Sequence, residues 1–178
     1  MLGVRRRPKV ETERMTLRLP QHPDWRAWSS LREASAAHLT PWEPLRDEQF
    51  YTLSYWHARL QDSYSQFFNG TGVNLVALDP AGERVIATCN FSNILMGVFK
   101  ACHLGYAIDQ QHQGQGVMGE VLSAAIDYLF REHDLHRIMA CYMPANQRSG
   151  ALLERLGFER EGFARAYLMI NGRWEDHI

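Results

Sequence analysis

The sequence predicts an α/β (α+β) protein with a mixed, mostly antiparallel central sheet of about seven strands, flanked by about four helices. Two observations predict this class. Apolar residues make up 46% of the 178-residue chain, which is enough for one sizeable core. Strand and helix patterns also follow one another in the order β-α-α-β-β-β-α-β-α-β-β. Since no repeat or linker divides the chain, residues 1–178 are expected to form a single domain.

The N-terminal third is expected to supply one strand and two helices. Residues 1–11 are basic and irregular, and we predict a mobile arm there. Residues 15–19 alternate apolar and polar side chains as a strand does. Helical patterns cover residues 24–38 and 49–68. The two prolines in the segment between them, residues 39–48, predict a constrained loop.

The remaining elements follow in quick succession. Strand patterns at residues 73–78, 85–94 and 103–109 predict an antiparallel meander. A helix is expected to open at Gly116, because apolar residues recur there at helical spacing. Its apolar stripe consists of Met118, Leu122, Ala125 and Leu129. A short strand at 137–142, a helix from 146 to 157 and a final hairpin turning at residues 171–172 complete the order.

Composition excludes several classes of protein. A net charge of −1 gives no case for direct nucleic-acid binding, and no apolar run approaches the length of a membrane span. The arginines at positions 5–7 are not followed by the apolar stretch of a signal peptide, so a cytoplasmic location is expected. Three scattered cysteines, Cys89, Cys102 and Cys141, predict buried free thiols. The eight histidines show no metal-ligand spacing, and no metal is expected.

The stretch from the third meander strand into the following helix carries the clearest functional signal. A polar loop over residues 110–116 holds two glycines and leads directly into a helix N-terminus. Such a junction binds anions, because free N–H groups and the positive end of the helix dipole point outward together. The loop lacks the Lys of the Walker pattern and the glycine spacing of the dinucleotide fingerprint. What remains is the spacing Q-x-x-G-x-G.

That spacing resembles the pyrophosphate loop of the GCN5-related N-acetyltransferases (GNAT), which bind acetyl-CoA, and the element order is also theirs. The resemblance implies that the strands before and after the central helix run parallel and splay apart to admit the pantetheine arm. Short stretches narrow it to the RimJ-type ribosomal-protein-alanine N-acetyltransferases. These stretches include Pro41-Trp42-Glu43-Pro44, Asn90-Phe91-Ser92-Asn93, Leu104-Gly105-Tyr106, Tyr142-Met143-Pro144 and Arg148-Ser149-Gly150. The implied activity is bacterial and cytoplasmic transfer of an acetyl group from acetyl-CoA to the N-terminal alanine of a ribosomal protein.

The resemblance also implies cofactor-binding residues. Pyrophosphate binding would use the backbone of Gln111, Gln113, Gly114, Gln115, Gly116 and Val117. Tyr106, Ala107 and Ile108 would pair their backbone with the pantetheine amides, although the latter two are equally expected as core residues. Asn146 is either a pantetheine ligand or a helix N-cap, and the sequence leaves both open.

Catalytic roles follow from the chemistry of an amine attacking a thioester. Ser149 is favoured over Tyr142 as the donor to the departing thiolate, and the alternative for Ser149 is a solvated helix hydroxyl. A free α-amine has a pKa of about 7.7–8.0, so a carboxylate suffices as base. Glu43 is the candidate base, with Trp42 anchoring its loop. The simpler interpretation of this loop is a packed connector with a solvated acidic edge. Glu175 or Asp176 would be the next candidates for the base.

Acceptor binding and the route of transfer complete the prediction. Asn90 and Ser92, on the polar face of their strand, are additional candidates for contacts with the acceptor. No cysteine is positioned as a covalent nucleophile, so direct transfer in a ternary complex is expected. Other protein N-termini, small amines or antibiotics are alternative acceptors, and a non-catalytic CoA-binding module is the alternative of a different class. Since relatives continue past the position of Ile178, the closing strand is expected to be incomplete, and the oligomeric state stays open.

Overall fold

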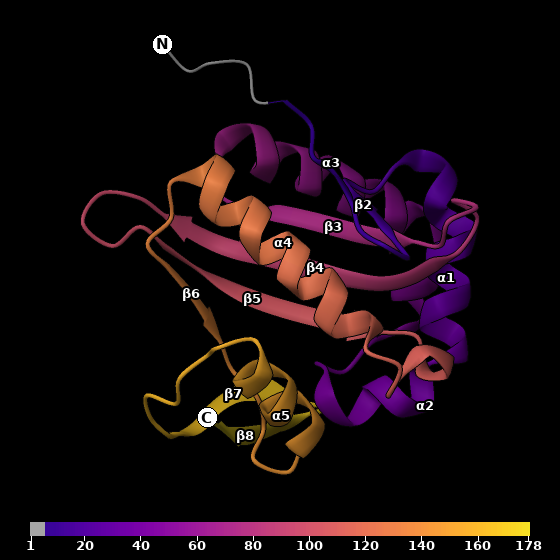
Figure 1. Cartoon of the computed structure of the whole chain (residues 1–178). Coiled ribbons are helices and arrows are strands. Elements are labelled where there is room, and N and C mark those ends of the chain that lie inside the picture. Colours follow the sequence, from indigo (N-terminus) through magenta and orange to yellow (C-terminus); the bar gives the residue numbers. More distant parts are fainter. Residues whose placement is uncertain (1–5) are drawn as a thin grey trace.

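The computed structural model describes residues 6–178, so the part of the predicted arm at residues 1–5 lies outside the described residues (Figure 1). The strands are β1 (Lys9–Glu11), β2 (Thr16–Arg18), β3 (Val73–Leu78), β4 (Val85–Leu95), β5 (Ala101–Ile108), β6 (Arg137–Ala140), β7 (Ala164–Ile170) and β8 (Arg173–His177). The helices are α1 (Trp25–Ala34), α2 (Ala36–Leu39), α3 (Leu53–Asn69), α4 (Val117–His133) and α5 (Gln147–Arg155). Four short 3-10 turns are η1 (His22–Asp24), η2 (Thr40–Trp42), η3 (Glu48–Tyr51) and η4 (Gln110–His112).

Six strands form one mixed sheet in the order β1-β2-β3-β4-β5-β6. The meander β3-β4-β5 is antiparallel throughout, as the sequence predicts. The chain leaves β5, crosses through α4 and returns as β6, which pairs parallel to β5. That crossover places the loop between β5 and α4 at the end of the sheet where β5 finishes (Figure 1).

Helices cover both faces of this sheet, and alternating residues of the strands supply the two cores. On one face α4 crosses the strands (Figure 1), and its predicted apolar stripe is 0–7% exposed. Trp28 of α1 and Trp56 of α3 pack with Val76 and Leu78 of β3 in the second cluster. Leu75 and Ala77, which alternate with these two β3 residues in sequence, belong to the α4 side. The period-2 alternation of β3 therefore holds α1 and α3 on one face and α4 on the other.

The structure corrects the expected sheet at its two edges. Residues 9–11, expected to be irregular, form β1, which pairs with β2 and packs Val10 against the core. At the other edge, β7 and β8 form a separate two-stranded sheet, so the main sheet has six strands rather than about seven. Tyr142 and Ile178 exchange two backbone hydrogen bonds, of 3.1 and 2.9 Å, which tie the end of the hairpin to the segment after β6. The predicted hairpin turn is confirmed, since Asn171 and Gly172 both have positive φ.

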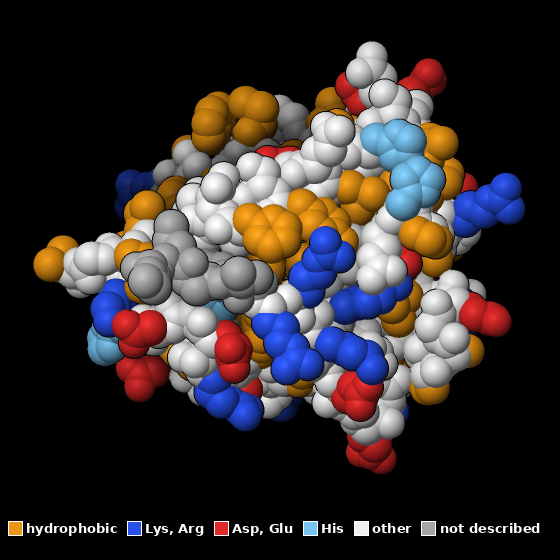
Figure 2. All heavy atoms as spheres, turned by 90° about the horizontal axis from the view of Figure 1, so that it is seen from above, with side chains coloured by type: hydrophobic (Ala, Val, Ile, Leu, Met, Phe, Trp, Pro, Cys, Tyr) orange, Lys and Arg blue, Asp and Glu red, His pale blue; other side chains and the backbone are white. Residues whose placement is uncertain are grey.

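The surface around β1 and β2 offers little uncompensated charge to a large partner. Seen from above, Lys and Arg side chains gather near the middle of one face with acidic side chains beside them (Figure 2). Around β1 and β2, Lys9, Arg14 and Arg18 each pair with a carboxylate, at 2.7, 2.6 and 2.7 Å. The charge of these three residues is therefore compensated within the fold. No helix within residues 6–178 combines the length and apolar character that crossing a membrane requires.

Candidate active site

The site begins where β5 and β6 stop pairing, which we call the splay. The parallel register runs from Ala101–Arg137 to Leu104–Ala140 and ends there. β5 continues to Ile108, hydrogen-bonded to β4 on its other side. Beyond Leu104, the edge of β5 that faces β6 has no strand partner among the described residues. An extended ligand can therefore pair with this backbone edge as an added strand does.

The predicted cofactor residues of β5 sit on that open edge. Ala107 is 6% exposed and pairs with Thr88 of β4, so its side chain belongs to the core while its backbone lines the splay. Ile108 is half-buried and packs against the core on the α4 side of the sheet. The two expectations for these residues, core side chain and ligand-facing backbone, are thus compatible in one geometry.

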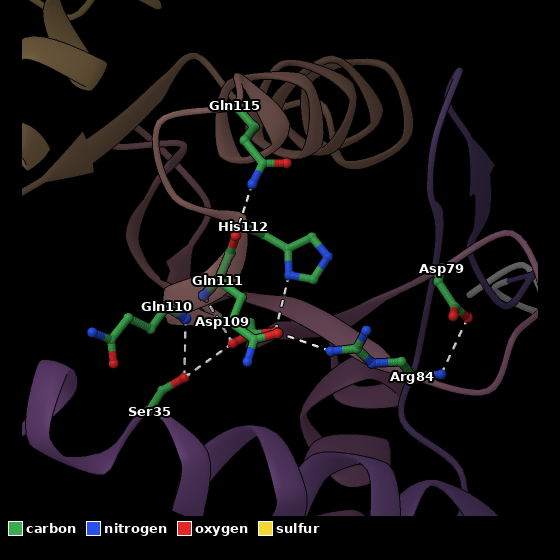
Figure 3. A network of polar contacts seen from close by, with 8 residues as sticks. All are labelled: Ser35, Asp79, Arg84, Asp109, Gln110, Gln111, His112 and Gln115. Atoms are coloured by element: carbon green, nitrogen blue, oxygen red, sulfur yellow. Dashed lines mark hydrogen bonds and ion pairs between the residues drawn. The ribbon is translucent and has the colours of Figure 1, made fainter.

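A buried carboxylate that the sequence analysis did not single out holds the loop after β5. Asp109 is 5% exposed and lies at the centre of a polar network (Figure 3). It accepts hydrogen bonds from the backbone N–H of Gln111 at 3.2 Å and from Arg84 Nη2 at 3.3 Å, and it contacts His112 Nδ1 at 2.9 Å. Ser35 accepts from the backbone N–H of the adjacent Gln110 at 3.1 Å. Asp109 therefore fixes the start of the loop to β5, to α1–α2 and to the β3–β4 turn.

The two glycines of the loop have the backbone that the motif requires. Gly114 and Gly116 have φ of 71° and 77°, in the left-handed region that favours glycine. A Cβ at Gly114 would meet no heavy atom within 4 Å, so the space above it is open. Gly116 is the N-cap of α4 and supplies no side-chain cap, which leaves the first N–H groups of α4 for another acceptor. The exposed, left-handed loop and the uncapped helix together fit a diphosphate.

Across the splay, the Ser149 hydroxyl at the start of α5 meets the Tyr106 hydroxyl of β5. Asn146 caps α5, accepting from the Ser149 backbone N–H at 3.2 Å, so its N-cap role is established while its Nδ2 group bonds nothing within residues 6–178. The Ser149 hydroxyl lies 2.6 Å from the Tyr106 hydroxyl, so it is not simply a solvated group. Burial raises the pKa of Tyr106, the Ser149 hydrogen bond opposes this shift, and Tyr142 adds to it. Tyr106 thus stays protonated and able to donate at neutral pH.

Tyr142, the competing acid, is held behind Ser149. It is 8% exposed, and its hydroxyl has no hydrogen-bond partner among the described residues. A Cβ at Gly150 would lie 2.7 Å from the Tyr142 ring, so only glycine at 150 allows the ring to pack there. Tyr142 also lines a hollow of about 670 Å³ between β6, α5 and the β7–β8 hairpin.

In the loop of residues 39–48, the candidate base Glu43 is paired within the fold. Glu43 is 19% exposed at its side chain, and both of its carboxylate oxygens accept from the guanidinium of Arg32, with Arg46 3.7 Å away. Asp47 accepts from the Phe50 N–H at 3.1 Å and caps η3. The Glu43 carbonyl accepts from the backbone N–H of Asn171 at 2.9 Å, joining this loop to the β7–β8 turn. Glu43 and Asp47 therefore both have partners within the fold.

The other predicted acceptor residues occupy less constrained positions. Trp42 is half-buried at the end of η2. Asn90 on β4 lies with its Oδ1 3.5 Å from Arg59 Nη2, and Ser92 is exposed two residues further along. Burial lowers the pKa of Arg59, with Arg32 and Arg46 acting in the same direction. This side of the molecule therefore combines one paired carboxylate with several guanidinium groups.

The cysteines offer no nucleophile in the core. Burial raises the pKa of both Cys89 and Cys102 to about 12, so neither is a thiolate at neutral pH. Cys141 is exposed, which corrects the expectation that all three are buried. No cluster of three or more His, Cys, Asp or Glu side chains within residues 6–178 is arranged to hold a metal ion.

The splay, the glycine loop and the uncapped α4 are the parts expected of an acetyl-CoA site, and comparison with known proteins agrees. A family model described as an acetyltransferase (GNAT) domain matches residues 14–159. The chain belongs to the GNAT acetyltransferase family. It is 46% identical over 182 residues to the ribosomal protein uS5-alanine N-acetyltransferase of Escherichia coli (strain K12), covering 100% of this chain and 93% of that GNAT relative.

Solved structures of related GNAT proteins extend the match to the fold. The ribosomal-protein-S5-alanine acetyltransferase from Vibrio fischeri superposes with a TM-score of 0.90 at 37% identity, covering 96% of this chain and 93% of that one. RimJ of Mycobacterium smegmatis, solved in complex with CoA-disulfide, gives a TM-score of 0.89 at 28% identity, with 96% and 84% covered. The predicted GNAT fold and the predicted resemblance to RimJ-type enzymes are both confirmed.

Sequence reasoning missed three features of this GNAT site. The sequence pattern predicts Asp109 as the end of a strand and Tyr106 as a backbone ligand only, and it gives no sign of Arg32. A polar residue directly before the Gln-rich loop was a usable signal for Asp109. The Tyr106–Ser149 and Arg32–Glu43 contacts join residues 43 and 11 positions apart, and no local pattern announces them.

Proposed function

We propose that this chain is a single-domain, acetyl-CoA-dependent N-acetyltransferase that acetylates the N-terminal alanine of ribosomal protein uS5. The observation that carries the proposal is 46% identity along the whole chain to the E. coli enzyme of that activity. The open edge of β5 and the glycine loop support a CoA thioester as acetyl donor, and CoA is bound in the M. smegmatis relative. A ribosomal acceptor supports a cytoplasmic location for the proposed activity, because ribosomal proteins are made there.

In the proposed reaction the chain first binds and orients the thioester. The backbone of residues 113–117 holds the diphosphate, with Gln111, whose N–H donates to Asp109, at the start of the loop. The β5 edge at residues 106–108 pairs with the pantetheine amides. A backbone N–H near the end of β5 would meet the negative charge that develops on the thioester carbonyl oxygen. Asn146, whose Oδ1 is occupied by the cap, has its Nδ2 group available for a pantetheine carbonyl.

Transfer is direct in this proposal. The neutral α-amine attacks the acetyl carbonyl carbon, the new C–N bond forms, the C–S bond breaks, and the sulfur leaves as a thiolate. Ser149 gives its proton to that sulfur, and the Tyr106 hydroxyl at 2.6 Å can replace the proton on Ser149. The proton that the newly acylated nitrogen loses returns through solvent to Tyr106, which restores the pair. The high pKa of the two buried thiols supports a route without an acetyl-enzyme.

The proton of the acceptor ammonium needs a base, and Glu43 is our proposal for it. Its loop, with Trp42, Asn90 and Ser92, forms the proposed acceptor side. The pairing of Glu43 with Arg32 restrains this role, because the carboxylate must release one oxygen before it can accept a proton. Glu175 and Asp176 are the alternatives, although Asp176 already accepts from the Ala166 N–H at 2.8 Å.

The direct test is to incubate the protein with isotopically labelled acetyl-CoA and ribosomal proteins from cells that lack this acetylation. We expect label on the N-terminal alanine of uS5, located by mass spectrometry. Label on another N-terminus would keep the enzyme and change the acceptor. Thiol release that does not respond to any amine, with acetyl-CoA bound, would instead indicate a CoA-binding module.

A further inference from the structure

Side chains from three elements meet beside the loop of residues 110–116. Gln113 lies between Arg148 of α5 and His38 of α2: Arg148 Nη1 donates to Gln113 Oε1 at 2.7 Å, and Gln113 Nε2 contacts the His38 ring. The loop follows β5 and α5 follows β6. The Gln113–Arg148 contact therefore bridges the two sides of the splay, as the Tyr106–Ser149 contact does.

Two arginines flank the loop, and only one of them has its charge compensated by a carboxylate. Arg14 donates to the Gln115 carbonyl at 2.9 Å, and its Nε pairs with Glu120 at 2.6 Å. Arg148 is exposed and donates to an amide oxygen, and within residues 6–178 it has no carboxylate at ion-pair distance. The loop itself contains neither Lys nor Arg. Arg148 is thus the flanking arginine whose charge remains uncompensated beside the proposed diphosphate site.

The third side chain beside the loop, His38, fixes the orientation of the Gln113 amide. Burial lowers the pKa of His38, and Arg148 lowers it further, while Glu43 opposes the shift. A neutral imidazole accepts a hydrogen bond, so the Gln113 amide nitrogen donates to His38 and its oxygen faces Arg148. Both ends of the Gln113 amide are held, and its oxygen keeps the Arg148 guanidinium beside the loop.

We propose that Arg148 is a phosphate-binding residue for acetyl-CoA, and that Gln113 holds it in position until the diphosphate arrives. The inference rests on the proposed function, because it assumes that CoA is the ligand of the loop. Arg148 exchanges a neutral amide acceptor for a diphosphate oxygen. That exchange is favourable, because the bond to phosphate adds the attraction between opposite charges, which a neutral amide oxygen does not supply. Arginine suits this role, since its planar fork can meet two phosphate oxygens.

The test is calorimetric titration of wild type and Arg148→Gln with three ligands: acetyl-CoA, its 3′-dephospho form and S-acetylpantetheine. For Arg148→Gln we expect affinity for both phosphate-bearing ligands to fall about tenfold to a hundredfold. Affinity for S-acetylpantetheine should change less than about twofold, because it lacks the diphosphate. The affinity of wild type for acetyl-CoA should also depend more steeply on salt than that of the variant.

Two control variants separate this role from general charge and from packing. Arg155→Gln removes the same charge from the far end of α5, and we expect acetyl-CoA affinity within about twofold of wild type. Gln113→Ala removes the amide that holds Arg148 in position but leaves the charge, so affinity should fall by no more than about threefold, less than in Arg148→Gln. Equal losses in Gln113→Ala and Arg148→Gln would overturn the proposal, since the contact itself would then be what the ligand needs.

The remaining outcomes are distinguishable from one another. If wild type binds acetyl-CoA and folded Arg148→Gln binds it equally well, the phosphate role is wrong while the proposed function stands. If the loss is confined to acetyl-CoA and absent for the 3′-dephospho form, Arg148 binds the 3′-phosphate and the diphosphate assignment is wrong. If wild type binds none of the three ligands, the proposed function itself has failed.

Discussion

The loops at residues 110–116 and 39–48 are each held by one shielded carboxylate, and they use it differently. Asp109 binds the chain itself: it accepts from the backbone N–H of Gln111, from Arg84 and from His112. The backbone N–H groups of residues 114–117 have no hydrogen-bond partner within residues 6–178. The Glu43 carboxylate pairs with Arg32, a side chain of α1. The first loop thus presents backbone to a ligand, and the second presents a paired carboxylate. A backbone site can be read from glycine positions, whereas a side-chain site depends on which partners the fold supplies.

The largest expected effect comes from destroying the backbone surface of the first loop. Gly116→Val places a β-branched residue at a φ of 77° and fills space at the uncapped α4. We expect acetyl-CoA affinity to fall by more than about a hundredfold, as a combination of strain and blocked access. Calorimetry measures it. Gly97→Val is the matched control, because Gly97 has a φ of 76° with nothing within 4 Å, in the β4–β5 turn. Equal loss in both variants would mean that strain, not the site, is responsible.

The second prediction removes the proposed proton donor and leaves both loops intact. Ser149→Ala should lower kcat by about a hundredfold and change acetyl-CoA affinity less than about threefold, because proton transfer to sulfur matters in the transition state. Tyr106→Phe should cost about tenfold in kcat, and the double variant no more than Ser149→Ala alone. Thiol release measures the rates. A greater loss from Tyr142→Phe would transfer the acid role to Tyr142.

The pH dependence of this pair has a definite sign. Burial raises the pKa of Tyr106 above its ordinary value, so its hydroxyl keeps its proton through the range in which the α-amine loses its own, about pH 7.7–8.0. The rate should therefore rise with pH as the amine deprotonates and show no fall from loss of the Tyr106 proton up to about pH 9. A descending limb below that pH that Tyr106→Phe abolishes would contradict the assignment.

The third prediction loosens the first loop without touching its glycines. Asp109→Asn keeps the shape of a 5% exposed side chain but turns one acceptor oxygen into a donor that faces Arg84 or His112. We expect the free energy of unfolding to fall by about 1–3 kcal/mol and acetyl-CoA to bind about tenfold more weakly. Asp127→Asn is the matched control: its ion pair with Arg131 has the same 3.3 Å length as Arg84–Asp109, but both side chains are exposed. That control should lose less than about 0.5 kcal/mol.

How much the sequence could predict follows the same division. Local patterns sufficed for the α4 stripe, the meander, the Asn171-Gly172 turn and the glycine loop, because each depends on neighbours in sequence. The second half of the site depends on contacts between distant residues. Ser35 reaches Asp109 across 74 positions, and Tyr106 reaches Ser149 across 43. The separate β7–β8 sheet was missed for the same reason, since alternation predicts a strand but not which edge it joins.

The smallest effect is expected from Glu43→Gln, and it decides what the second loop does. The substitution removes the charge and keeps the shape, leaving Arg32, whose side chain is 8% exposed, without a carboxylate. If Glu43 contacts the acceptor ammonium, the Michaelis constant for a peptide with the uS5 N-terminus should rise about threefold to tenfold, with acetyl-CoA affinity unchanged. If it is also the base, the pH–rate profile should move upward, because the amine must then lose its proton to solvent.

Arg32→Gln separates these roles from simple support of the loop. It removes the partner and leaves the carboxylate, so a purely structural pair predicts the same kinetic change in both variants. If Glu43 is catalytic, the two variants should instead change in different directions. Arg32→Gln frees the Glu43 oxygens and makes them better proton acceptors, while Glu43→Gln abolishes them. The pH–rate profiles of the two variants toward the peptide, between about pH 6 and 9, would then diverge. Profiles identical to wild type in both would make Glu43 a support of the β7–β8 turn through its carbonyl bond to Asn171, and the search for the base would move to Glu175 and Asp176.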